Sequence, residues 1–175
     1  MELDKAIKMA TMPMPIPGLH QKFMQLASAH TNFCAGPGFI DSESDDAMLQ
    51  GSCCSTMDFS RYKDQINGLK EFLSIPQVPT DPYDISVSSA KQLLSYDKDI
   101  ILTTGQQSIY DEATKQANEH GPCCCKCWRW NAMEGLAKYL IRNQAFTATQ
   151  IAKIWDLEDG CGGKDEQPSG MSVGT

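Results

Sequence analysis

Apolar residues recur every three or four positions along most of this chain, which is the spacing of one face of an α-helix. Helices are predicted over residues 19–30, 59–73, 86–96, 104–120, 122–143 and 147–157. We therefore expect a mostly α fold, a bundle of about six helices with irregular loops rich in cysteine and glycine. The expected domain covers residues 1–163, and residues 164–175 have the composition of a flexible tail.

Proline, glycine and acidic residues separate the predicted helices. The alternating prolines of residues 12–18 favour an extended run after a short helix over 2–10. Residues 34–55 are rich in glycine, serine and aspartate and are expected to form an irregular loop. Residues 99–103 could form a strand, although the pattern offers no partner strand for it.

Side chains that can accept backbone hydrogen bonds mark several helix starts. In a capping box, a threonine and a glutamine three residues later each bond to the other's backbone amide. The expected capping residues are Thr56 or Asp58, Thr104 with Gln107, and Thr147 with Gln150.

Eight cysteines are the chemically distinctive feature of the chain. They form four groups, each with a glycine within two residues of its first cysteine: Cys34; Cys53 and Cys54; Cys123, Cys124, Cys125 and Cys127; and Cys161. Glycine lets the backbone approach a bulky ligand and lets amides point at sulfur. A chain of 175 residues can bury an ordinary core without cross-links. We therefore interpret all eight cysteines as candidate metal ligands.

Two of these groups are expected at helix N-termini. Cys53 and Cys54 precede the helix over 59–73, and residues 123–127 lie at or inside the first turn of the helix that Pro122 begins. The free amides and partial positive charge of a helix N-terminus favour thiolate over thiol. Both groups are therefore predisposed to metal binding or redox chemistry.

The spacing narrows the kind of centre. Cys124 and Cys127 form a C-x-x-C pair, and on one helical face they could share an ion, as could Cys123 and Cys127. Adjacent cysteines on a helix point about 100° apart, so they rarely bind one ion together. The grouping favours a polynuclear centre or two centres over one tetrahedral zinc, for which a second C-x-x-C would be the stronger signal.

Sites made only of thiolates suit iron–sulfur clusters, zinc or Cu(I). The surplus of cysteines favours an iron–sulfur centre that serves in electron transfer or in an accessory redox protein. The alternative is a zinc, copper or soft-metal protein for storage, delivery or sensing. Met9, Met12 and Met14, with His20 and His30, offer further soft ligands for copper. Either reading implies a redox or metal-exchange protein as partner.

Adjacent cysteines used together with distant ones are similar to the pattern in the cysteine-rich domains of heterodisulfide reductases. The carriers of this resemblance are Cys53-Cys54 and the run of residues 123–125, with the distant Cys161. The resemblance implies noncubane iron–sulfur clusters. The spacings differ from that family's motif, so no residue role is transferred.

A third interpretation is an enzyme, a thiol–disulfide oxidoreductase that uses Cys124 and Cys127. A C-x-x-C at a helix N-terminus has a lowered thiol pKa, which such chemistry needs. Against it, the sequence lacks the hydrophobic strand that precedes this motif in a thioredoxin-like unit.

The overall charge excludes some functions. The net charge is −7 and the isoelectric point is near 4.9, so the chain gains nothing by neutralising nucleic-acid phosphates. No apolar stretch approaches the roughly 20 residues of a membrane span. Without a visible leader, a cytoplasmic location with reduced thiols is expected, unless a leader peptide has been removed.

The helix arrangement also predicts where the cysteines meet. Antiparallel neighbours in a bundle bring the end of one helix beside the start of another. Cys161 follows the last helix, while the run of residues 123–127 begins the helix before it. We therefore expect Cys53, Cys54, the run 123–127 and Cys161 to converge on one locus.

Overall fold

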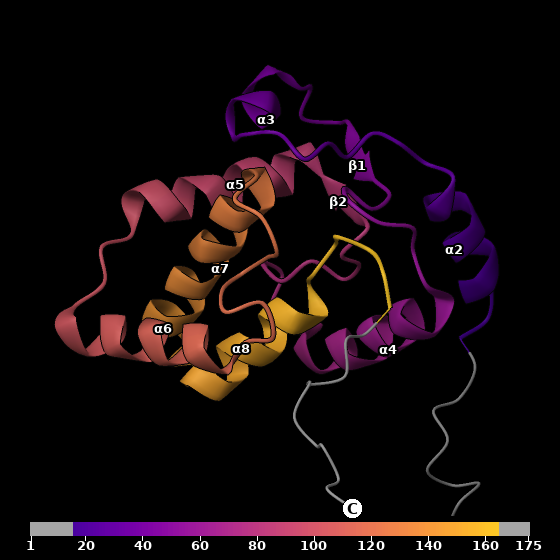
Figure 1. The fold of residues 1–175 in the computed structure, drawn as a ribbon. Helices are drawn as coiled ribbons and strands as arrows, with labels where there is room; N and C mark the ends of the chain where they lie inside the picture. The colour runs from indigo at the N-terminus through magenta and orange to yellow at the C-terminus, as the bar shows by residue number, and fades with distance from the viewer. Residues whose placement is uncertain (1–15, 165–175) are drawn as a thin grey trace, which may run out of the picture.

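The computed structural model describes residues 16–164, and the chain is mostly helical, as the sequence predicts (Figure 1). In that range the α-helices are α2 (Leu19–Ala27), α3 (Gly38–Ser42), α4 (Phe59–Leu69), α5 (Val87–Asp99), α6 (Thr104–Gln116), α7 (Trp128–Gln144) and α8 (Ala148–Leu157). A 3-10 turn, η1 (Lys70–Phe72), continues α4. The predicted helix over 2–10 lies outside the described residues, as does most of the proline run.

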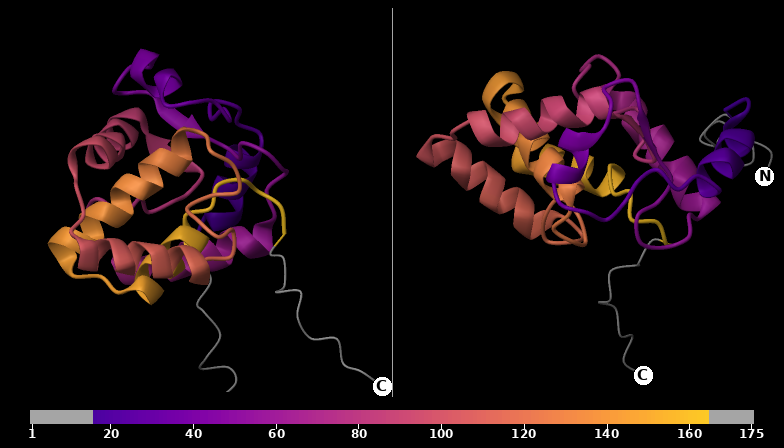
Figure 2. Two further views of the ribbon diagram at one scale, coloured as in Figure 1. Left: turned by 60° about the vertical axis from the view of Figure 1, so that its left-hand side comes forward. Right: turned by 90° about the horizontal axis from the view of Figure 1, so that it is seen from above.

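Helix α7 packs along α5 in the main apolar core. Figures 1 and 2 show α5, α6 and α7 at one end of the molecule, α2 and α4 at the other, and α8 between them. Leu136, Met133 and Leu140 of α7 are fully buried in this core. Gly135 permits the contact, because a Cβ there would lie 1.9 Å from the carbonyl oxygen of Leu93. A side chain at position 135 would therefore force the two helices apart.

A second, smaller apolar cluster joins α2 to α4. Tyr62 of α4 is buried there beside Tyr83, with ring centroids 5.9 Å apart. The Tyr62 hydroxyl donates to Asp81 at 2.7 Å, and Lys22 of α2 lies 3.2 Å from the same carboxylate. The polar ends of this cluster are thus paired where they are buried, as a buried hydroxyl requires.

Two short strands form a part of the fold that the sequence pattern missed. Strands β1 (Met48–Gln50) and β2 (Asp84–Ser86) pair antiparallel, with Leu49 opposite Ile85. The expected irregular loop over 34–55 therefore contains α3 and β1, elements too short to show a hydrophobic period.

The prediction of a strand over residues 99–103 is wrong. Helix α5 continues to Asp99, and residues 100–103 connect it to α6 without strand pairing. Ile100 is buried whereas Ile101 is 86% exposed, so this apolar run is divided between core and solvent.

The helix starts test the capping predictions. Asp58 accepts a hydrogen bond from the Arg61 amide at 3.0 Å, and the box of Thr147 with Gln150 is present. The box before α6 uses Thr103 with Gln106, one residue earlier than expected. Threonine occupies both 103 and 104, and glutamine both 106 and 107, so the sequence offered two registers.

The start of α7 is the correction that matters most for the site. The helix begins at Trp128, not at Pro122, and Cys127 is its N-cap residue. Residues 121–127 are irregular, and His120 before them has a left-handed backbone with φ of 52°. The Trp128 amide donates to the Ala35 carbonyl at 2.7 Å, which attaches the helix start to the loop that carries Cys34. No helix in the described range is long and apolar enough to cross a membrane.

Candidate metal centre

Four segments bring all eight cysteines to one place. They are the loop before α3, the turn after β1, the segment before α7 and the segment after α8. The expected convergence is therefore confirmed as geometry, and it includes Cys34 and Cys125. The thiols are free of disulfides in this structure.

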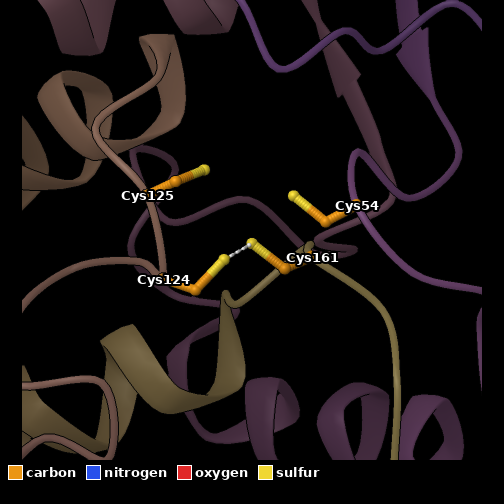
Figure 3. Close-up of side chains that lie close together, drawn as sticks. All are labelled: Cys54, Cys124, Cys125 and Cys161. Atoms are coloured by element: carbon orange, nitrogen blue, oxygen red, sulfur yellow. Dashed lines mark hydrogen bonds between the residues drawn. The ribbon is translucent and has the colours of Figure 1, made fainter.

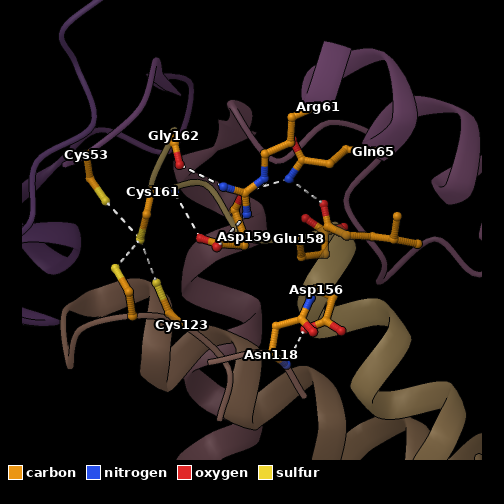
Figure 4. A network of polar contacts seen from close by, with 12 residues as sticks. Cys53, Arg61, Gln65, Asn118, Cys123, Asp156, Glu158, Asp159, Cys161 and Gly162 are labelled. Carbon is orange, nitrogen blue, oxygen red and sulfur yellow. Dashed lines mark hydrogen bonds and ion pairs between the residues drawn. The ribbon is translucent and has the colours of Figure 1, made fainter. Parts of the chain in front are cut away.

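Cys161 is the hub of the cluster. Its sulfur lies 2.7 Å from that of Cys124, 3.1 Å from that of Cys123 and 3.7 Å from that of Cys53. Figure 4 shows the sulfurs of Cys53 and Cys123 converging on that of Cys161 from different segments. Cys161 is also common to two of the groups of side chains that could hold a metal ion.

We define the outer set as Cys54, Cys124, Cys125 and Cys161. Their four sulfurs all lie within 4.8 Å of one another. Figure 3 shows the four side chains gathered in one place. With metal–sulfur bonds of about 2.3 Å, four sulfurs around a tetrahedral ion are separated by about 3.8 Å. The outer set therefore has the compactness of a site for one ion.

We define the inner set as Cys53, Cys123, Cys127 and Cys161. Their sulfurs form a closed ring of contacts: Cys161 touches Cys53 and Cys123, and both of these touch Cys127. The eighth cysteine, Cys34, lies at the exposed edge, where its sulfur is 3.1 Å from that of Cys125 and within 4.8 Å of those of Cys53, Cys54 and Cys127.

The two sets differ in exposure. In the inner set Cys123, Cys127 and Cys161 are only 1%, 3% and 5% exposed. In the outer set Cys54 and Cys124 are exposed to solvent. The cluster therefore has a buried base and an open mouth, and Cys161 belongs to both.

Hydrogen bonding favours one thiolate in each set. Cys127 accepts bonds from Cys123, from Cys53 and from the amides of Arg129 and Trp130, and these lower its pKa well below the ordinary value despite burial. Burial alone would raise the pKa of Cys54, but hydrogen bonds from neighbouring thiols lower it. The Cys123 pKa is raised by its bonds to Cys127 and Cys161 and by burial. A thiolate is the form that binds metal, so each set has a first ligand.

Backbone hydrogen bonds hold the cysteine segments together. The Cys53 amide donates to the Gly160 carbonyl at 3.3 Å, and the Ser55 amide donates to the Cys161 carbonyl at 2.8 Å. Gly162 has φ of 78°, and a Cβ there would lie 2.0 Å from the Ser55 carbonyl oxygen. Glycine at 162 is therefore required for the close contact of these two chain segments.

Trp128 and Asn32 fix the third segment. The Trp128 indole donates to the Asn32 side-chain oxygen at 3.1 Å, and the Asn32 amide group donates to the Gly51 carbonyl at 3.1 Å. Both side chains are buried. They therefore link the start of α7 to the turn that precedes Cys53.

A buried guanidinium supplies positive charge beside the cluster. Arg129 is fully buried and donates to the carbonyls of Pro82 and Glu158, at 2.7 and 3.1 Å. The hydrogen bond to Cys127, together with burial, raises the pKa of Cys53, and the Arg129 charge acts to lower it. Gly160 leaves room for it, because a Cβ there would lie 2.4 Å from the guanidinium carbon. Thiolates repel one another, and a fixed cation reduces that cost.

Acidic side chains lie on the same side of the cluster. Asp159 accepts from the Cys161 amide at 3.0 Å and pairs with Arg61 at 2.7 Å, as Figure 4 shows. Glu158 is fully buried, and its carboxylate oxygens have no hydrogen-bond partner among the residues described. Burial raises the Glu158 pKa well above its ordinary value, although Arg129 acts to lower it. Burial therefore favours the neutral form of Glu158.

A polar cleft of about 810 Å³ opens beside the outer set. Cys54, Cys124 and Cys161 line one side of it. The other side is formed by the end of α6, the turn over residues 118–122 and part of α8. The cleft is the route by which a solvent molecule can reach the sulfurs.

Several sequence interpretations of the site need correction. Cys123, Cys124 and Cys125 lie before α7 rather than on it, so the argument from a shared helical face does not apply. The N-terminal amides of α7 instead act on Cys127 alone. Cys53 and Cys54 precede the cap of α4 as expected.

The two tryptophans beside the cysteine run differ in burial. Trp128 lies fully buried in the main core, while Trp130 is half-buried above Gly121, with the Lys126 ammonium 5.5 Å from its ring centroid. The sequence reasoning also missed Arg129 and Asn32. The position of Arg129 between two tryptophans on an apolar helix could have indicated that this arginine is buried.

No protein-family model, no curated protein and no solved structure matches the chain. The argument for function therefore depends on the geometry of the sulfurs. Cysteine groups in this arrangement could hold a metal ion.

Proposed function

We propose that this protein binds a soft metal in a polynuclear thiolate centre, with Zn²⁺ or Cu(I) as the metal, and acts in metal storage, delivery or sensing. The observation that carries the proposal is the outer set, whose four sulfurs lie within 4.8 Å of one another. Soft thiolate ligands select these ions, and a tetrahedral ion needs this spacing.

The spacing also orders the two metal hypotheses that the sequence left open. In a cubane cluster the inorganic iron and sulfide atoms stand between the four cysteines, so their sulfurs lie farther apart than the ligands of one ion. The outer-set sulfurs all lie within 4.8 Å of one another, which suits ligands of a single ion better than the wider spacing around a cubane. The thiolate centre without inorganic sulfide is therefore the first candidate.

An iron–sulfur centre for electron transfer is the second candidate. Eight cysteines in one cluster exceed what a single ion needs. The buried Arg129 and the apolar wall of Trp128 are features that tune a redox potential. The third hypothesis, an oxidoreductase using Cys124 and Cys127, gains no support, because these sulfurs contact different partners.

The proposed role implies a partner and a compartment. A storage or delivery protein exchanges metal with another thiol-bearing protein. Free thiols persist only where the surroundings are reducing, which agrees with a cytoplasmic location.

Purification without oxygen, followed by analysis for zinc, copper, iron and acid-labile sulfide, tests the proposal. Stoichiometric zinc or copper without sulfide is the expected result. Iron with sulfide would favour the second candidate instead. A protein that carries no metal, and takes up none under reducing conditions, would contradict both.

Two serine variants make a matched pair for the same analysis. Cys161→Ser removes the sulfur common to both sets, and we expect it to lose most of the bound metal. Ile101→Ser changes a residue that is 86% exposed and belongs to no cysteine group that could hold a metal ion, and it should retain the metal. Equal metal content in the two variants would show that the hub is not a ligand.

A further inference from the structure

The outer and inner sets have different access to solvent. Two outer sulfurs, those of Cys54 and Cys124, are exposed and line the cleft. The inner Cys123 and Cys127 are buried and do not line the cleft. An ion in the outer set is therefore open to an incoming ligand, whereas an ion in the inner set is enclosed.

The walls of the cleft carry both signs of charge. Lys115 and Lys164 contribute ammonium groups, and Glu119 and Asp156 contribute carboxylates. The volume of about 810 Å³ is in the range of small-molecule sites. These walls complement a small molecule that itself bears amino and carboxylate groups.

We propose that the two sets hold separate metal ions joined through Cys161, and that only the outer ion exchanges, with a small peptide thiol that enters through the cleft. This inference rests on the proposed metal-binding function and adds the regulation of the site and the class of its ligand. The thiol supplies a soft ligand, and its charged groups meet the mixed charges of the walls.

The exchange is a ligand substitution without oxidation. The incoming thiol loses its proton and its sulfur binds the outer ion. The Cys124 sulfur leaves the ion and takes up a proton, so charge and protons balance. Cys124 is the leaving ligand because it is exposed and lines the cleft. Repetition at Cys54, Cys125 and Cys161, each sulfur being replaced in the same way, would release the ion from the outer set.

The test follows zinc release from the full chain, loaded with zinc without oxygen, into an excess of the chromophoric chelator 4-(2-pyridylazo)resorcinol. Two phases of equal amplitude are expected, one for each set. Glutathione should accelerate the fast phase alone. S-methylglutathione has the same charged groups without a thiol and should accelerate neither phase.

A single release phase would overturn the inference while leaving the proposed function intact. Acceleration of both phases by glutathione, or equal acceleration by S-methylglutathione, would overturn it as well. A chain that binds no zinc would instead contradict the proposed function, so the two failures are distinct.

Matched variants assign the phases. Cys124→Ser should lose the fast phase and about half of the zinc, since each ion takes about four thiolates. Ile101→Ser should keep both phases, because this residue is 86% exposed and belongs to no cysteine group that could hold a metal ion. Retention of the fast phase in Cys124→Ser would reject the assignment. Circular dichroism of each variant separates these results from unfolding.

Discussion

Helix α7 presents an apolar face to α5, whereas the segment just before it carries four cysteines on irregular backbone. The first region is held by burial of side chains such as Leu136, and the cysteines lie outside that core. The second is held by backbone hydrogen bonds between loops, by Trp128 and Arg129, and by the metal that we propose.

The difference teaches how stability and chemistry are separated in this chain. A packed helix pair is rigid without a ligand, because its apolar surface is removed from water. Loops that bring thiols together lack such burial, and they expose sulfurs that repel one another once ionised. We therefore expect damage to the core to affect folding, and damage to the loops to affect metal binding.

The largest expected effect on stability comes from a substitution in the main apolar core. Leu136→Ala removes a fully buried side chain and should lower the free energy of unfolding by about 3 kcal/mol. Denaturant unfolding followed by circular dichroism measures it. The folded variant should still bind the wild-type amount of metal. A loss of metal by the folded variant would show that core and centre are coupled more closely than we infer.

Gly160→Ala tests the place where the two regions meet. The new Cβ would lie 2.4 Å from the Arg129 guanidinium carbon, so the arginine must give up hydrogen bonds to Pro82 and Glu158. Loss of these buried bonds should cost about 2 kcal/mol and should also weaken metal binding. Competition with a metal chelator measures the affinity. A variant with unchanged affinity would remove Arg129 from the account of the centre.

Glu158→Gln tests how the buried carboxyl beside the cysteine cluster makes stability depend on pH. The folded-state pKa of Glu158 is raised above its ordinary value of 4.5, so the folded protein keeps a proton that the unfolded chain releases. That stabilisation is complete below 4.5 and is lost as the pH rises through the folded pKa. Metal-free Glu158→Gln should lack this decline and gain about 1 kcal/mol over wild type at neutral pH. Parallel pH profiles of the two proteins would contradict it.

Metal removal is expected to have the smallest effect on the helices. A chelator should leave the far-ultraviolet circular dichroism almost unchanged, because the main core contains no cysteine. The near-ultraviolet signal of Trp128 should change, since its neighbours Asn32 and Cys127 belong to the cysteine segments. Loss of the helical signal on metal removal would show that the bundle depends on the centre.

The sequence by itself determined the helical class, because a period of 3.6 residues encodes which face of each helix is buried. It also determined that Cys53 and Cys54 precede a helix and that Cys161 follows one, and it identified the caps at Asp58 and Thr147. The register at Thr103 was left ambiguous because two identical residue pairs stand one position apart. The strands β1 and β2 could not be predicted from the sequence, because each is only three residues long and too short to show an alternating pattern.

Only the tertiary structure decided how the sulfurs are shared. Cys161 lies 37 positions from Cys124 and 108 from Cys53, and no local pattern specifies contacts at such separations. The start of α7 at Trp128 also depends on a distant partner, the carbonyl of Ala35. The identity of the ligands is local information carried by residue type. Their division into a buried set and an exposed set follows from which chain segments pack around them, and packing is a property of the whole fold.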